Sequence, residues 1–126
     1  MPHLLLVMLG GAIGAGFRYQ VGRFALGWMG PHFPWGTFIV NLAGGFLMGV
    51  LAGVLGRLSE GGEAFRLFLG VGVLGGFTTF SAFSLETANM LMRGQAVPAA
   101  VYSVASVAGS VTCLFLGLWL ASRIIG

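Results

Sequence analysis

Long apolar runs alternate along the chain with short segments that carry all of its charges. Uncharged runs cover residues 1–17, 24–56, 67–85 and 94–122. A helix needs about 20 apolar residues to cross the hydrocarbon core of a bilayer. The pattern therefore predicts an all-α membrane protein with four transmembrane helices.

The breaks between the runs set the expected ends of these helices. Residues 30–34 contain two prolines and a glycine, residues 58–63 are polar, and Gly94 with Gln95 makes a turn. The predicted helices cover about 3–27, 34–57, 64–93 and 97–123. The chain, 1–126, is thus expected to be a single four-helix transmembrane domain in a microbial plasma or inner membrane.

Composition excludes several other classes of protein. The 126 residues are 57% hydrophobic and 7% charged, whereas about a quarter of the residues in a soluble domain are charged. The six cations are scattered arginines rather than a basic patch, so nucleic acid is not an expected partner. The lone Cys113 excludes an intrachain disulfide. No Ser/His/Asp or Cys/His arrangement indicates an enzyme, and the N-terminus lacks the charged start of a cleaved signal peptide.

The third helix has poor helix formers near its centre. Gly75 and Gly76 precede Phe77, and the pair Thr78 and Thr79 follows. Non-helical backbone is tolerated at membrane depth only where protein or a water-filled cavity satisfies its polar groups. We expect a break at residues 75–79 in the middle of the membrane, where freed carbonyls can bind an ion. The alternative is a continuous helix that packs closely at its glycines.

Glycines four residues apart mark other positions of close packing. Gly10 and Gly14 form one such pair, and Gly45, Gly49 and Gly53 form a longer stripe. Stripes of small residues let membrane helices approach closely. They predict a compact bundle with little room for a large substrate.

The arginines give no orientation in the membrane. Four spans place Arg18, Arg23 and Arg93 toward one side and three further arginines toward the other, namely Arg57, Arg66 and Arg123. Orientation normally follows an excess of Lys and Arg on one side. Equal numbers favour insertion in both directions and an antiparallel, dual-topology homodimer. The alternative is that buried arginines do not count and one orientation remains.

Polar residues inside the apolar runs are candidates for function, because such residues are costly in lipid. Asn41 lies deep in the second run, and Tyr102, Ser106 and Ser110 follow one face of the fourth helix at a spacing of four. Glu86 is the only acid outside the polar loop, and Arg18 is its expected partner. A helix–helix hydrogen bond is the simpler interpretation of Asn41.

Two phenylalanines stand among hydroxyl groups near the expected break. Phe80 and Phe83 share a helical face and are accompanied by Thr79 and Ser81. A phenyl ring has a positive edge, so ring edges together with hydroxyl donors can replace part of the hydration shell of a small anion. Packing bulk is the commoner role of phenylalanine, and the pair alone does not select this function.

Three segments together resemble the Fluc/CrcB family of fluoride channels. Residues 75–84 read GGFTTFSAFS, residues 11–19 read GAIGAGFRY and residues 36–44 read GTFIVNLAG. Length, four spans and the order of the motifs agree over the whole chain, and the 75–84 string is the most specific. Ala82 departs from the family, which commonly has threonine there.

The resemblance implies a fluoride-selective channel for passive efflux, built as an antiparallel homodimer with two pores. It implies a structural sodium ion on the dimer axis, held by the backbone carbonyls of Gly75 and Thr78. It also implies a fluoride pathway that includes Asn41 as a pore donor and Arg18 near a vestibule. The remaining pathway residues would be Phe80, Phe83, Ser81, Thr79, Tyr102, Ser106, Ser110 and Glu86.

Two other classes of protein are alternatives to a fluoride channel. A small dual-topology multidrug exporter is also a four-helix chain of this size, but it needs an acid in its first helix, which is absent here. A non-transporting membrane subunit would explain the glycine stripes but not the amide and hydroxyl groups at Asn41, Thr79 and Ser106.

Overall fold

The computed structural model describes residues 2–58 and 61–125, and every regular element in them is helical. The first two spans are single helices, α1 (His3–Met29) and α2 (Trp35–Leu55), and the last is α6 (Ala96–Ile125). The third span is assembled from α3 (Glu63–Phe65), the π-helical η1 (Arg66–Leu74), α4 (Gly75–Phe77) and α5 (Ser81–Met92). Gly30 and Gly94 end two of these helices with positive φ, a conformation that favours glycine.

The outer surface of this bundle is apolar. Four helices are long and apolar enough to cross a membrane, and only 11–22% of each spanning window is buried within the chain. Large side chains such as Leu4, Phe24 and Phe115 are exposed on this surface. Such a surface is stable only against lipid or another protein.

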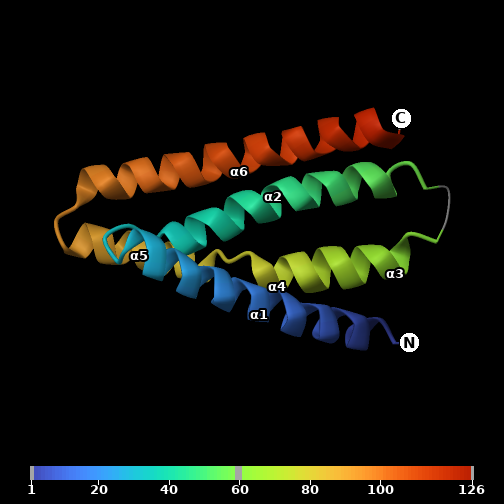
Figure 1. Cartoon of the computed structure of the whole chain (residues 1–126), viewed down its shortest axis with the longest axis horizontal. Coiled ribbons are helices and arrows are strands. Elements are labelled where there is room, and N and C mark those ends of the chain that lie inside the picture. The colour runs from blue at the N-terminus through green and yellow to red at the C-terminus, as the bar shows by residue number, and fades with distance from the viewer. Residues whose placement is uncertain (1, 59–60, 126) are drawn as a thin grey trace.

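The four spans run back and forth, as Figure 1 shows. Both termini and the connection between α2 and α3 lie at one end, and the α1–α2 and α5–α6 turns lie at the other. The most extensive packing joins α2 to α6 and α1 to η1, and α1 also contacts α4. The interrupted third span therefore lies between helices that approach it from two sides.

Glycines allow the two main helix pairs to approach at backbone distance. A Cβ added at Gly49 or Gly117 would overlap backbone atoms across the α2–α6 contact. A Cβ added at Gly10 or Gly14 would overlap the backbone of η1 or its junction with α4. The expected role of Gly10, Gly14 and Gly49 in close packing is confirmed.

The third span changes helical form twice along its length. In η1 the hydrogen bonds reach one residue further back than in an α-helix, so the Gly75 amide donates to the carbonyl of Gly70. The helix then continues through Gly75–Phe77, and residues 78–80 have no helical assignment. Thr78 is extended, with φ −85° and ψ 160°. The glycine pair is therefore helical, and the non-helical residues follow it.

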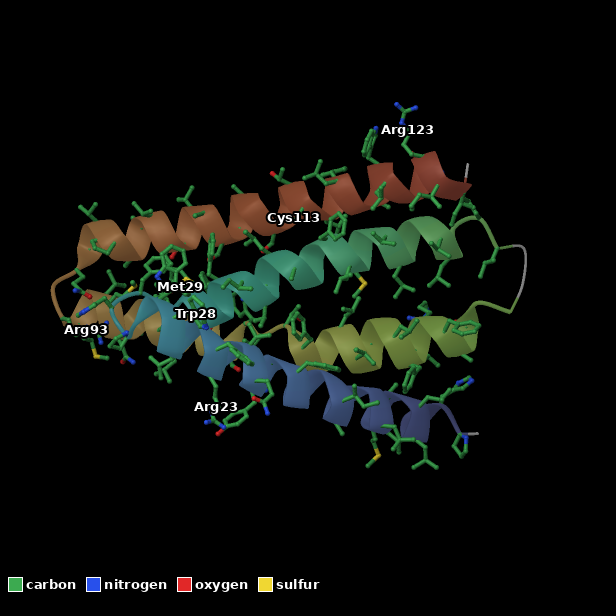
Figure 2. The ribbon with its side chains drawn as sticks, viewed as in Figure 1. Arg23, Trp28, Met29, Arg93, Cys113 and Arg123 are labelled. Carbon is green, nitrogen blue, oxygen red and sulfur yellow. The ribbon has the colours of Figure 1, made fainter. Side chains whose placement is uncertain are left out.

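The arginines are not divided equally between the two ends. Arg23 and Arg93 lie toward the end with the two turns and Arg123 lies near the C-terminus, as Figure 2 shows. Arg18 lies roughly 16 Å along α1 from Met29, at 1.5 Å per residue, and its side chain bonds inside the bundle. The expectation that it counts toward an end is therefore wrong. The expected count of three arginines at each end becomes two at one end and three at the other. Neither end has a strong excess of arginine.

We expect Gly49→Ala to destabilise the protein by about 1–3 kcal/mol, because the added methyl overlaps the backbone of Leu114 in α6. Gly27→Ala is the matched control, since its methyl would meet no described atom within 4 Å. Both changes add the same helix propensity. Thermal unfolding in detergent should give a lower midpoint for Gly49→Ala than for Gly27→Ala, and equal midpoints would contradict this account of the α2–α6 contact.

Candidate functional site

The non-helical residues 78–80 lie against α2, where Asn41 contacts Thr79. The Asn41 Nδ2 donates to the Thr79 carbonyl (3.0 Å), and the Thr79 amide donates to the Asn41 Oδ1 (2.9 Å). In an unbroken helix that amide would donate to the carbonyl of Gly75. Asn41 therefore supplies both partners to one residue of the interruption and has one amide hydrogen left.

A second side chain reaches the third span from α1. The Arg18 Nε donates to the carbonyl of Gly76 (3.1 Å), which an unbroken helix would pair with the amide of Phe80. Gly10, Gly14 and Arg18 recur every four residues and so share one face of α1. The close approach at the two glycines brings the arginine alongside Gly76.

The start of α5 is capped by a residue of the interruption itself. The Thr79 Oγ1 accepts a hydrogen bond from the Ala82 amide (3.1 Å), three residues further along. This is the geometry of a threonine that caps a helix N-terminus. The Ser81 hydroxyl lies 3.3 Å from the same Thr79 oxygen, so these two predicted site residues share a hydrogen bond.

Two backbone carbonyls beside the interruption remain free to accept a hydrogen bond or to bind a cation. Among the described residues, no hydrogen bond reaches the carbonyl oxygen of Gly75 or of Thr78. The amides that would pair with them in an unbroken helix donate to Asn41 and to the Thr79 hydroxyl instead. Free carbonyl oxygens at an interrupted membrane helix are the kind of group that coordinates sodium. These two residues therefore fit the sodium ligands expected from the sequence.

Beyond the interruption, two aromatic rings lie together. The ring centroids of Phe80 and Phe83 are 5.6 Å apart, and Phe83 lies 5.1 Å from Tyr102 on α6. Phe80 is 77% exposed on this chain, whereas Tyr102 is fully buried. The ring of Phe80 thus projects from the chain at the expected anion site, whereas Phe83 is partly buried and packs against the core.

A cavity of about 380 Å³ lies beside these rings, between α2, the interruption and α6. One buried polar atom in its lining, the hydroxyl oxygen of Ser106, has no hydrogen-bond partner among the described residues. Ser106 is only 5% exposed, and an unpaired buried hydroxyl is costly. The cavity brings together six of the residues expected to line the fluoride pathway: Asn41, Thr79, Phe80, Phe83, Ser106 and Ser110.

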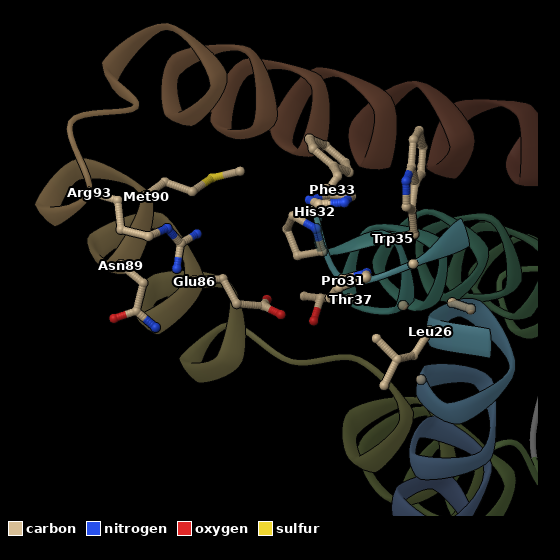
Figure 3. Close-up of a pocket in the computed structure, with 15 residues that line it drawn as sticks. Leu26, Pro31, His32, Phe33, Trp35, Thr37, Glu86, Asn89, Met90 and Arg93 are labelled. Atoms are coloured by element: carbon tan, nitrogen blue, oxygen red, sulfur yellow. The ribbon is translucent and has the colours of Figure 1, made fainter. Parts of the chain in front are cut away.

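A second cavity, of about 330 Å³, lies at the end that holds the α1–α2 turn. Glu86 on α5 and Arg93, which directly follows α5, extend toward that turn, and Thr37 on α2 lies across from them (Figure 3). The Tyr102 hydroxyl donates to the Glu86 Oε1 (3.2 Å). Tyr102 thus contacts Glu86, which lines this cavity, and also Phe83, which lines the Ser106 cavity.

The expected pairing of Glu86 with Arg18 is wrong. Arg18 bonds to Gly76, and Glu86 accepts from Tyr102. Glu86 lies on α5, beyond the interruption and packed against α6, whereas Arg18 contacts the span before the interruption. Thr37, His32 and Arg93 also line the second cavity. They were not expected there, since no single motif joins these three positions.

Comparisons with known proteins show the family of the chain. The family model described as "CrcB-like protein, Camphor Resistance (CrcB)" matches residues 5–118. A protein of Novosphingobium aromaticivorans is 60% identical over 120 residues, which cover 94% of each chain. A protein of Phenylobacterium zucineum is 57% identical over 125 residues, which cover 98% of each chain. Both carry the name "Fluoride-specific ion channel FluC". The chain is a multi-pass membrane protein and belongs to the CrcB family.

Proposed function

We propose that the chain forms a fluoride-selective channel, which lets fluoride leave the bacterial cell passively and so reduces its toxicity. The observation that carries this proposal is the unpaired, buried hydroxyl of Ser106, which faces the same cavity as Phe80 and Phe83. Support also comes from the names of two relatives, which are 60% and 57% identical to this chain.

A small anion loses its hydration shell only if other donors replace the water. The Ser106 hydroxyl is free to donate, and so is the second amide hydrogen of Asn41. The positive edges of the two phenyl rings add weaker attraction. Donors without a fixed positive charge bind an anion and still release it, as conduction requires.

The proposed route continues from the Ser106 cavity to the end with the two turns. Ser110 and Ser106 lie on the α6 face that leads to Tyr102, and Glu86 follows in the second cavity. The Tyr102 hydroxyl is directed to the Glu86 carboxylate, so Tyr102 offers its ring rather than its proton to the anion. Arg93 would attract anions to this mouth and offset the charge of Glu86.

One copy of the chain does not complete such a pore. Phe80 and Gly75 are exposed at the expected anion and sodium sites, and most of each span is unburied. A second copy, inserted in the opposite direction, would cover these residues and give two equivalent pores. The near-even arginine distribution is compatible with such an antiparallel homodimer.

A sodium ion at the dimer axis would fit the free carbonyls of Gly75 and Thr78 from both subunits. Hard cations prefer oxygen ligands, and freed carbonyls of interrupted helices supply them in other transporters. When bound, the ion would make the interior more positive and so favour an anion. The chain's own part is to present these carbonyls without competing hydrogen bonds.

We expect Phe80→Ile to reduce fluoride efflux from proteoliposomes by roughly tenfold or more, the effect of losing about 1.4 kcal/mol of stabilisation. The change keeps an apolar side chain but removes the positive ring edge. Phe115→Ile, on the exposed face of α6, is the matched control and should conduct as the wild type does. A fluoride electrode measures efflux against chloride with no proton gradient, and equal rates for the two variants would remove the Phe80 ring from the mechanism.

Ser106→Ala should separate conduction from stability. Removing an unpaired buried hydroxyl should leave stability unchanged or raise it by about 1 kcal/mol, whereas the loss of a donor should lower fluoride efflux severalfold. Ser103→Ala on the same helix is the control, because Ser103 does not line the cavity. Thermal midpoints in fluoride-free buffer and efflux rates are compared, and unchanged efflux with Ser106→Ala would contradict the proposed site.

A further inference from the structure

We propose that Arg18 and Asn41 form a backbone clamp that holds the third span in its interrupted form. Each reaches the span from a different helix, and together they bond to three backbone groups that the interruption leaves without helical partners: the Gly76 carbonyl and both the amide and the carbonyl of Thr79. The clamp assigns both side chains a positioning role, in addition to the vestibule and pore positions expected from the sequence.

The pattern of backbone hydrogen bonds across the interruption supports this role. The Thr78 amide still makes the helical bond to Leu74 (3.0 Å), and the next helical bond runs from the Ser84 amide to Phe80 (2.8 Å). Between these two bonds, the continuous helical pattern is lost. Leaving a backbone polar group unpaired away from water costs several kcal/mol, so without the clamp this segment would be driven to rewind or to open.

The orientation of the Asn41 side chain follows from the same contacts. Its oxygen accepts from an amide and its nitrogen donates to a carbonyl, so the side chain fits Thr79 in one orientation only. Asparagine thus provides a donor and an acceptor at the spacing of a peptide group. Aspartate has the same shape but would place an acceptor against the Thr79 carbonyl.

Close packing places both members of the clamp. Gly44 lies one turn from Asn41 on α2, and a Cβ there would overlap the Thr78 side chain. A Cβ at Gly76 would come within 3.0 Å of the Gly11 Cα on α1. The third span is therefore packed against the backbone of α1 and, through the Thr78 side chain, closely against α2. One side chain from each of these helices completes the contact.

The clamp would determine where the groups of the proposed anion site point. Thr79 caps α5 through its hydroxyl, and Phe80 follows it directly. The carbonyls of Gly75 and Thr78 alternate with the clamped positions 76 and 79. This consequence rests on the proposed function. The clamp itself concerns only the backbone conformation of the third span, so it can be tested without fluoride.

Hydrogen–deuterium exchange in lipid nanodiscs, without fluoride, tests the clamp. The amides of Thr79 and Ala82 are both hydrogen-bonded in the structure. Arg18→Met removes the donor to Gly76, and we expect roughly tenfold faster exchange at these two amides, the effect of losing about 1.4 kcal/mol. Asn41→Asp should accelerate exchange at Ala82, while amides in the middle of α6 stay unchanged as the internal reference.

Matched variants separate a local role from general destabilisation. Arg23→Met removes an arginine from the same helix, where Arg23 lies over the ring of Tyr19, and should not change exchange at residues 79–82. Arg18→Lys keeps a donor and should restore most of the protection. Wild-type exchange at both amides in Arg18→Met and Asn41→Asp would overturn the clamp, and Arg18→Met decides alone if Asn41→Asp does not fold.

Fluoride efflux tests the proposed function, and amide exchange tests the clamp, so the two can fail independently. A wild-type protein that passes no fluoride, with faster exchange in the variants, would overturn the channel and support the clamp. Normal fluoride efflux with unchanged exchange would overturn the clamp and support the channel.

Discussion

A backbone polar group has no water to bond to in the hydrocarbon core, and this constraint governs the third span. Three residues, 78–80, depart from the helix there. The groups set free receive partners from α1 through Arg18, from α2 through Asn41, and from the Thr79 hydroxyl. The interruption is thus part of the packing of the bundle, and each neighbouring helix contributes to it.

Small residues make these distant hydrogen bonds possible. A guanidinium or an amide reaches a backbone atom of the next helix only when the helix axes are close. The glycines of α1 and α2 give that distance at Gly14 and Gly44, one turn from Arg18 and Asn41. Glycines on the other side of α2 likewise allow close packing against α6, which carries Ser106 and Ser110. Close packing and the site are therefore one arrangement, since loosening a helix contact would move the groups that line the cavity.

Sequence reasoning reached the helical class, the four apolar spans and the family, because lipid imposes a simple pattern of long uncharged runs. It also selected Phe80, Phe83, Ser106 and Asn41, since polar and aromatic residues stand out in such runs. It did not predict η1, because a π-helix and an α-helix use the same residues and differ only in which carbonyl an amide selects.

Side-chain partners were harder to predict than positions. The only acid outside the polar loop suggested a pair between Glu86 and Arg18. Charge alone, however, does not show on which side of an interruption each residue lies. The four-residue spacing of Gly10, Gly14 and Arg18 could have indicated the true partner of Arg18. An arginine at the end of a glycine stripe lies where two backbones meet, and a carbonyl is then its nearest acceptor.

The polar groups of the interior fall into two sets with different consequences. Arg18, Asn41 and Thr79 are engaged with backbone, and their bonds fix the shape of the site. The Ser106 hydroxyl and the carbonyls of Gly75 and Thr78 have no partner in the described chain. A membrane protein retains an unpaired polar group at a free-energy cost, and a bound ion offsets that cost. The donor lies beside the rings and the two acceptors lie at the interruption, so the chain presents groups of the right polarity for an anion and for a cation. Through its backbone contacts, the paired set would hold in position Thr78 and Phe80, which line the same cavity as Ser106.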